Sequence, residues 1–232
     1  MPGAPEAFAS IVTSPIKIDI WSDIACPWCY IGKRHFEEGL AALGDDAPDV
    51  EIEYHSYELA PDTPVDFEGS EVDFLAKHKG LPAERVQQML QHVTGVAANA
   101  GLDYDFDVLQ HTKTLKAHEL LHFAKAQGRQ LELSERLFKA YFTEGRHVGR
   151  IDELVELAVD AGLDADGARE ALESGRYAAD VQADIAQAGA YGINGVPFFV
   201  FEGKYGVSGA QPAEVFGQVL TQVAGERDGA AA

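Results

Sequence analysis

The segment Cys26-Pro-Trp-Cys29 limits the fold of this chain more than any other feature, because it stands between a predicted strand and a predicted helix. Over residues 16–21 isoleucine alternates with other side chains, which predicts a strand. Pro27 suits the first position of a helix, where its missing N–H needs no partner. Apolar side chains then recur at steps of three and four until Gly44, and a second alternating run covers residues 50–55. These patterns predict a β-α-β unit with both cysteines at the start of its helix.

The remainder of the chain changes its hydrophobic period twice. Residues from about 61 to 183 show helical periodicity in segments that mostly end at a glycine. Alternation returns at Phe198–Glu202 and Tyr205–Ser208, joined by a tight turn at Gly203-Lys204, which predicts a hairpin. A last amphipathic helix covers Gln211 to about Gly225. The order predicts an α/β fold, β-α-β and later β-β-α, with a large all-helical insertion. The predicted boundaries are residues 15–60 and 184–226 for a discontinuous α/β domain, 61–183 for the insertion, and 1–14 and 227–232 for flexible ends.

Charge and cysteine usage exclude several classes of function. The 232 residues carry 18 basic and 38 acidic side chains, a net charge of −20, whereas binding to nucleic acid or to an anionic membrane needs clustered Lys and Arg. No apolar run approaches the ~18 residues that cross a bilayer. The first twenty residues lack the pattern of a secretory signal, so we expect a cytoplasmic protein. Two cysteines are too few for a disulfide scaffold or a four-cysteine zinc site, and a Cys-x-x-Cys in a reducing compartment indicates redox chemistry or metal binding.

The position of the cysteines at a helix start predicts different roles for the two thiols. Unpaired backbone N–H groups and the positive end of the helix dipole favour a thiolate at Cys26. Cys29 lies one turn further along, on the apolar face, and we expect its sulfur to be the more buried one. Cys26 is therefore the predicted nucleophile toward a substrate, and Cys29 is the thiol that resolves the mixed disulfide.

Three segments of the chain resemble one known family. The run Asp19–Arg34, DIWSDIACPWCYIGKR, is similar to the active-site segment of the DsbA-like thioredoxin-fold oxidoreductases, and within them to the FrnE-type proteins. The second segment is Gly192–Val200, GINGVPFFV, followed by Gly203–Gln211, GKYGVSGAQ. The third is Ala140–Arg146, AYFTEGR. Together the similarity spreads over nearly all of residues 16–224.

The resemblance implies a thioredoxin fold with a helical insertion, in which Cys26 and Cys29 form a redox-active disulfide and no other cofactor is needed. It also implies a cis bond between Val196 and Pro197, in a loop that packs against the cysteine pair. Such a loop would expose the Val196 backbone to an incoming polypeptide and keep a metal from docking between the sulfurs. The expected substrate-binding residues are Pro27, Trp28, Val196 and Pro197.

Polar residues before the cysteines carry weaker hypotheses. Asp19 lies seven positions before Cys26, in a strand that resembles the Asp-x-Trp strand of thioredoxins. It is either a proton relay to Cys29 or an aspartate at the solvent-exposed edge of the strand. Ser22 and Asp23 are expected to shape the loop and the entry into the helix.

The run His118-Glu-Leu-Leu-His122 matches the zinc-protease signature H-E-x-x-H, with both imidazoles on one helical face. No glycine and third histidine follow at the spacing of the extended signature. Helix packing explains the two histidines adequately, and we expect no metal site in this chain.

The leading hypothesis is a thiol–disulfide oxidoreductase or isomerase that acts on protein or peptide substrates, with glutathione as a candidate co-substrate. We expect neither nucleic acid nor a membrane as a partner. One alternative is a glutathione-dependent isomerase or transferase of small molecules, since such enzymes resemble this fold; Cys29 argues against it, because a conjugating enzyme needs no resolving thiol. A second alternative is a binding or chaperone module in which the helical insertion does the work and the dithiol is vestigial.

Overall fold

The computed structural model describes residues 14–231, so the predicted N-terminal arm lies, except for Ser14, outside the described residues. Four strands form one sheet in the order β2-β1-β3-β4. β1 pairs in parallel with β2 and antiparallel with β3, and β3 pairs antiparallel with β4. The strands are β1 (Ile16–Ser22), β2 (Val50–Ser56), β3 (Phe198–Phe201) and β4 (Tyr205–Ser208). Helix α1 (Pro27–Ala41) connects β1 to β2, which confirms the predicted β-α-β unit, and β3 and β4 form the predicted hairpin.

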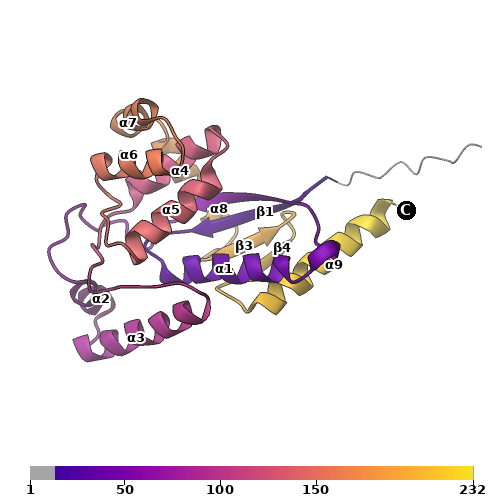
Figure 1. Ribbon diagram of the computed structural model, residues 1–232, viewed down its shortest axis with the longest axis horizontal. Helices are drawn as coiled ribbons and strands as arrows, with labels where there is room; N and C mark the ends of the chain where they lie inside the picture. Colours follow the sequence, from indigo (N-terminus) through magenta and orange to yellow (C-terminus); the bar gives the residue numbers. More distant parts are fainter. Residues whose placement is uncertain (1–13, 232) are drawn as a thin grey trace, which may run out of the picture.

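Helices cover both faces of the sheet (Figure 1). On one face α1 and α9 (Ala213–Ala231) pack together, and Phe36 of α1 and Phe216 of α9 contact Phe199 of the sheet. On the opposite face Trp21 packs in a smaller cluster with Ala188 of α8 (Ala178–Ala190). The side chains of β1 divide between these clusters by strand alternation, because neighbouring residues point to opposite faces.

The residues between β2 and α8 form the helical insertion. Its helices are α2 (Glu71–Lys79), α3 (Ala83–Asn99), α4 (Leu115–Ala126), α5 (Gln130–Phe142), α6 (Ile151–Asp160) and α7 (Ala165–Ser174). Helices α4 to α7 pack on one another, while α2 and α3 form a separate pair near the start of α1 (Figure 1). The largest apolar cluster of the protein fills this insertion and includes both cysteines. The start of α1 is therefore enclosed by the insertion as well as by the sheet.

Two boundaries differ from the sequence patterns. The predicted boundary between residues 183 and 184 falls inside α8, which packs on β2 and α4. The last helix continues to Ala231, well beyond Gly225, so residues 227–231 are helical where we expected a flexible end. An ion pair of 2.6 Å between Lys204 and Glu226 ties this last stretch to the β3–β4 turn. Within residues 14–231 no helix is long and apolar enough to span a membrane.

Candidate active site

The two cysteines lie at the start of α1, as the sequence predicts. Cys26 is the N-cap residue, with extended backbone angles of φ −90° and ψ 110°, and Pro27 follows in the first turn. The backbone N–H of Cys26 donates to the carbonyl of Asp23 over 3.0 Å, and the N–H of Cys29 donates to the carbonyl of Cys26 over 3.0 Å. Both side chains are free thiols. The loop before the helix therefore fixes Cys26 at the N-terminal end of the helix dipole.

The expected difference in burial between the two thiols is almost absent. Cys26 is 3% exposed and Cys29 is 2% exposed, because the insertion covers the start of α1. The two differ in their surroundings instead, since Cys26 lines a cavity and Cys29 does not. Burial and the adjacent Cys26 thiol raise the pKa of Cys29 well above its ordinary value. Cys29 is thus a protonated thiol behind the accessible one.

The Val196–Pro197 loop packs on the cysteine pair, as the resemblance implies. The bond between Val196 and Pro197 is cis. The Cys26 thiol donates to the Val196 carbonyl over 3.5 Å, although 170 positions separate the two residues. Gly32 permits this approach, because a Cβ there would lie 3.0 Å from Cγ of Pro197. The loop and the first two turns of α1 therefore form one surface.

A cavity of about 600 Å³ lies in front of Cys26. Pro27, Trp28 and Val196 line it together with Cys26, whereas Pro197 packs behind them against Gly32. The opposite wall comes from the helical insertion. Its side chains there include Thr63, Glu71, Phe74, Leu75, His78, Lys79, Arg85, Met89, His92, Val93, Phe106 and His111. The volume falls within the range of small-molecule and peptide-side-chain sites.

A dithiol at a helix start, a cis-proline loop on its sulfur and a helical insertion facing it are combined in this chain. The family model of the DSBA-like thioredoxin domain matches residues 17–221. The chain belongs to this family. The predicted fold class, a thioredoxin fold with a large helical insertion, is thereby confirmed.

Relatives of this DSBA-like chain include one curated protein and several solved structures. The uncharacterized protein YwbO of Bacillus subtilis is 33% identical over 211 residues, covering 89% of this chain and 96% of its own. A probable DsbA oxidoreductase from Streptomyces coelicolor is 43% identical, covers 91% of each chain and superposes with a TM-score of 0.84. The cytosolic disulfide reductase DsbM from Pseudomonas aeruginosa, solved with GSH, is 18% identical and shares the fold, with a TM-score of 0.62 over 89% of this chain and 98% of its own.

Asp23 lies in the loop between β1 and Cys26, and sequence reasoning assigned it only a shaping role. It is 1% exposed and accepts hydrogen bonds from the N–H of Leu59 over 2.8 Å and from Nε2 of His118 over 3.3 Å. Burial alone would raise the pKa of Asp23, but the hydrogen bond and charge of His118 hold it below the ordinary value. This ionised carboxylate joins the cysteine loop to α4 and to the segment after β2.

The two histidines of the H-E-x-x-H run each contact a different buried carboxylate. His118 pairs with Asp23, and Nε2 of His122 lies 3.0 Å from Asp184 of α8. The same face of α4 therefore ties the insertion to the cysteine loop and to the sheet. This arrangement agrees with the expectation that helix packing explains both imidazoles.

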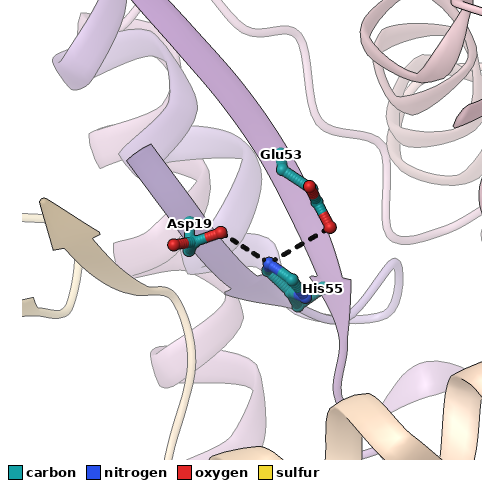
Figure 2. A group of neighbouring side chains, drawn as sticks. All are labelled: Asp19, Glu53 and His55. Carbon is teal, nitrogen blue, oxygen red and sulfur yellow. Dashed lines mark hydrogen bonds and ion pairs between the residues drawn. The ribbon is translucent and has the colours of Figure 1, made fainter. Parts of the chain in front are cut away.

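The contacts of Asp19 lie within the sheet and give the predicted proton relay to Cys29 no support. Asp19 Oδ1 lies 2.8 Å from Nε2 of His55 on the neighbouring strand (Figure 2) and 3.3 Å from Nζ of Lys17. Strand alternation places Asp19 on the same face as Trp21, which α8 covers, whereas α1 packs on the other face with the isoleucines. The sheet thus separates the Asp19 carboxylate from the helix that carries the cysteines.

One group of side chains has the geometry to hold a cation. Ligand-type atoms of Asp19, Glu53 and His55 lie within 4.8 Å of one another (Figure 2). The other nitrogen of His55 donates to Asp184 over 2.8 Å, an arrangement that also orients metal-bound histidines. Burial lowers the pKa of His55, but its hydrogen bonds to Asp184 and Asp19 outweigh this and raise it.

Lysines already supply positive charge to both carboxylates of this group. Lys17 pairs with Asp19, and Lys125 forms an ion pair with Glu53. The two lysines thus balance the charges of Asp19 and Glu53 without a metal. The expectation that the chain binds no metal stays a prediction.

Sequence reasoning missed the contacts through which the insertion holds α1. The hydroxyl of Tyr104 donates to the carbonyl of Pro27 over 2.7 Å, directly between the cysteines. Glu135 of α5 accepts from the hydroxyl of Tyr30 over 2.6 Å and pairs with Lys33 over 2.7 Å. Burial would raise the pKa of Glu135, but Arg34 and these two partners lower it to about 2. The spacing of the partners along α1, on one helical face, was the available signal.

Proposed function

We propose that this protein catalyses thiol–disulfide exchange with protein or peptide substrates through Cys26 and Cys29. The observation that carries the proposal is the asymmetry of the two thiols: Cys26 lines a cavity at a helix N-terminus, whereas Cys29 does not line it and has a raised pKa. Membership of the DSBA-like family supports the reaction class. A helix start and an open front suit a nucleophile, and a buried neighbour suits a resolving thiol.

The reductive direction balances as two successive displacements. The Cys26 thiolate attacks one sulfur of a substrate disulfide, so a mixed disulfide forms and the other substrate sulfur leaves as a thiolate. Cys29 then loses its proton and attacks the Cys26 sulfur, which forms the Cys26–Cys29 disulfide and releases the second substrate thiolate. Two electrons pass from the protein dithiol to the substrate, and both substrate sulfurs take up protons.

A low-molecular-weight thiol such as glutathione would return the protein to the dithiol form. The likeness to DsbM, whose structure contains GSH, supports this partner, and a cytoplasmic setting makes reduction or isomerisation the natural direction. Pro27, Trp28 and Val196 contact the substrate in this proposal, because they border the cavity that Cys26 faces. Pro197 acts by holding the Val196 carbonyl against the Cys26 sulfur.

The size of the cavity, about 600 Å³, also favours a second candidate, a glutathione-dependent isomerase or transferase of small molecules. The two candidates differ in what they require of Cys29. An enzyme that only binds glutathione at Cys26 keeps its activity in Cys29→Ser, whereas an exchange enzyme loses multiple turnover.

Insulin reduction by the wild type, Cys26→Ser and Cys29→Ser, with limiting glutathione as the reductant that regenerates the dithiol, tests the proposal. We expect turnover only in the wild type, and an accumulated mixed disulfide with insulin only in Cys29→Ser. Glutathione conjugation of an electrophile that survives Cys29→Ser would favour the second candidate. Equal and negligible reduction by all three proteins would overturn the exchange reaction and leave a binding or chaperone module with a vestigial dithiol.

A further inference from the structure

Three of the eight large apolar side chains that are exposed among the described residues line the cavity in front of Cys26. Trp28 is 38% exposed, Leu59 is 42% exposed and Met89 is 38% exposed, and all three line the cavity. They come from α1, the segment after β2, and α3. Exposed apolar groups that converge on one hollow mark a binding surface for an apolar group of a ligand.

The basic residues without a counterion gather in the same region. Of the 18 Lys and Arg residues, 14 form ion pairs within 4.0 Å among residues 14–231. The remaining four are Lys77 and Lys79 of α2, Arg85 of α3, and Lys113. Lys79 and Arg85 line the cavity in front of Cys26, and Lys77 borders the hollow next to it. The distribution is selective, because the chain carries a net charge of −20.

The acidic residues of the cavity wall leave this positive charge uncompensated. Only Asp23 and Glu71 are acidic among the lining residues in the described part of the chain. Both are buried, and each is already paired with a histidine, Asp23 with His118 and Glu71 with His111 over 2.7 Å. A ligand in the cavity therefore meets free positive charge near its rim and no free carboxylate in its wall.

We propose that the cavity selects disulfide-bearing peptides in which an acidic side chain and a large apolar side chain flank the cysteine. The acidic group pairs with Lys79 and Arg85, the apolar group packs on Trp28 and Met89, and the disulfide then faces Cys26. This inference rests on the proposed exchange reaction and names its substrate class. On a strongly acidic protein, such a local basic rim attracts anionic peptides and repels cationic ones at short range.

Single-turnover reduction of three peptides tests this specificity. Each substrate is a disulfide-linked homodimer of a heptapeptide with one Cys and one Leu fixed and two flanking positions that are both Glu, both Gln or both Lys. The reduced protein supplies the electrons, so no other reductant is added, and released peptide thiol is followed by chromatography. We expect the Glu peptide to be reduced roughly tenfold faster than the Lys peptide at low salt, with a smaller ratio in 0.5 M NaCl, because salt screens the attraction.

A charge-reversed variant locates the effect. In Lys79→Glu/Arg85→Glu we expect the ratio of Glu to Lys peptide rates to fall to one or below. The matched control is Arg129→Glu/Arg176→Glu, which changes the net charge equally at two half-exposed residues outside the cavity and should keep the wild-type ratio. Equal rates for all three peptides in the wild type, or the same loss of preference in both variants, would overturn the inference while leaving the exchange reaction intact. Failure of the wild type to reduce any peptide would instead contradict the proposed function.

Discussion

At the scale of single residues, the difference between the two thiols predicts selective alkylation. Iodoacetamide reacts with thiolates, and burial beside Cys26 raises the pKa of Cys29. At pH 8 we expect Cys26 to be modified at least tenfold faster than Cys29, as measured by peptide mass spectrometry. Comparable rates at the two cysteines would show that Cys29 is as reactive as Cys26, which contradicts the assigned roles.

Asp23 and Asp19 both precede the cysteines, and we expect Asn at Asp23 to reduce the stability of the fold. Asp23→Asn removes a buried charge that His118 and two backbone N–H groups depend on, so we expect a loss of about 3 kcal/mol in the free energy of unfolding. The pKa of Asp23 is lowered, so this contribution is present above about pH 4 and is lost as the pH falls through the folded pKa. Urea unfolding of the wild type and Asp23→Asn at pH 7 and pH 3 measures both the loss of stability and its dependence on pH.

The variant Asp19→Asn tests whether Asp19 takes part in the exchange reaction. Because the sheet separates Asp19 from α1, we expect the rate of disulfide formation between Cys26 and Cys29 to change less than twofold. A large, pH-dependent slowing of disulfide formation in Asp19→Asn would support the proton-relay hypothesis.

At the scale of elements, the contact between α1 and α9 depends on Gly39. A Cβ at this position would overlap the carbonyl oxygen of Ala213 and lie 3.0 Å from Cβ of Phe216. We expect Gly39→Ala to destabilise the fold by about 1–3 kcal/mol. Gly95→Ala is the control, since no atom lies within 4 Å of its added Cβ, and an alanine within α3 should stabilise by about 0.5–1 kcal/mol. Thermal unfolding measures the change in melting temperature for each variant. Equal changes in the two variants would contradict the close packing of α1 on α9 at Gly39.

Helix α8 is fastened to the sheet by one carboxylate. Asp184 accepts from the N–H of Ser56 and from Nδ1 of His55, both over 2.8 Å, and pairs with His122. We expect Asp184→Asn to cost about 2–4 kcal/mol at pH 6, against little change for the exposed Asp180→Asn. The pKa of Asp184 is lowered, so its contribution is lost as the pH falls below about 4.

His55, the partner of Asp184, makes the stability of this pair depend on pH in the opposite direction. Its pKa is raised in the folded protein, so its contribution is complete below about pH 6.5 and is lost as the pH rises through the folded pKa. The stability difference between the wild type and Asp184→Asn should therefore be largest between these limits. A difference that does not vary between pH 3 and pH 9 would exclude this charge network.

At the scale of the whole molecule, the α/β part was predictable because its evidence is local. Period-two alternation marks β1, β2 and the hairpin, and Pro27 marks the helix start, so each signal lies within about ten residues of the element that it predicts. The same alternation also predicts the face on which Asp19 lies. Asp19 alternates with the isoleucines, and the isoleucines pack on α1, so the Asp19 side chain points to the other face of the sheet.

The cavity could not be predicted in the same way. Its wall combines Trp28, the loop at Val196 and helices α2 and α3, and their meeting depends on how the insertion docks onto the start of α1. The hydroxyl of Tyr104 and the carboxylate of Glu135 fix that docking through contacts across 77 and 105 positions. No periodicity within one segment reports such a contact, so the identity of the substrate-facing residues in the insertion required the structure.

The central claim, that Cys26 and Cys29 act as one redox couple, is tested most directly by a redox titration. The protein is equilibrated with reduced and oxidised glutathione in varied ratios, quenched with acid, and analysed by intact mass and thiol labelling. We predict a single two-electron transition in which both thiols disappear together, with a mass loss of two hydrogens and one Cys26–Cys29 disulfide. If no intramolecular disulfide forms at any ratio, or if glutathione adducts accumulate separately on the two cysteines, the two thiols are not a redox couple and the exchange reaction is contradicted.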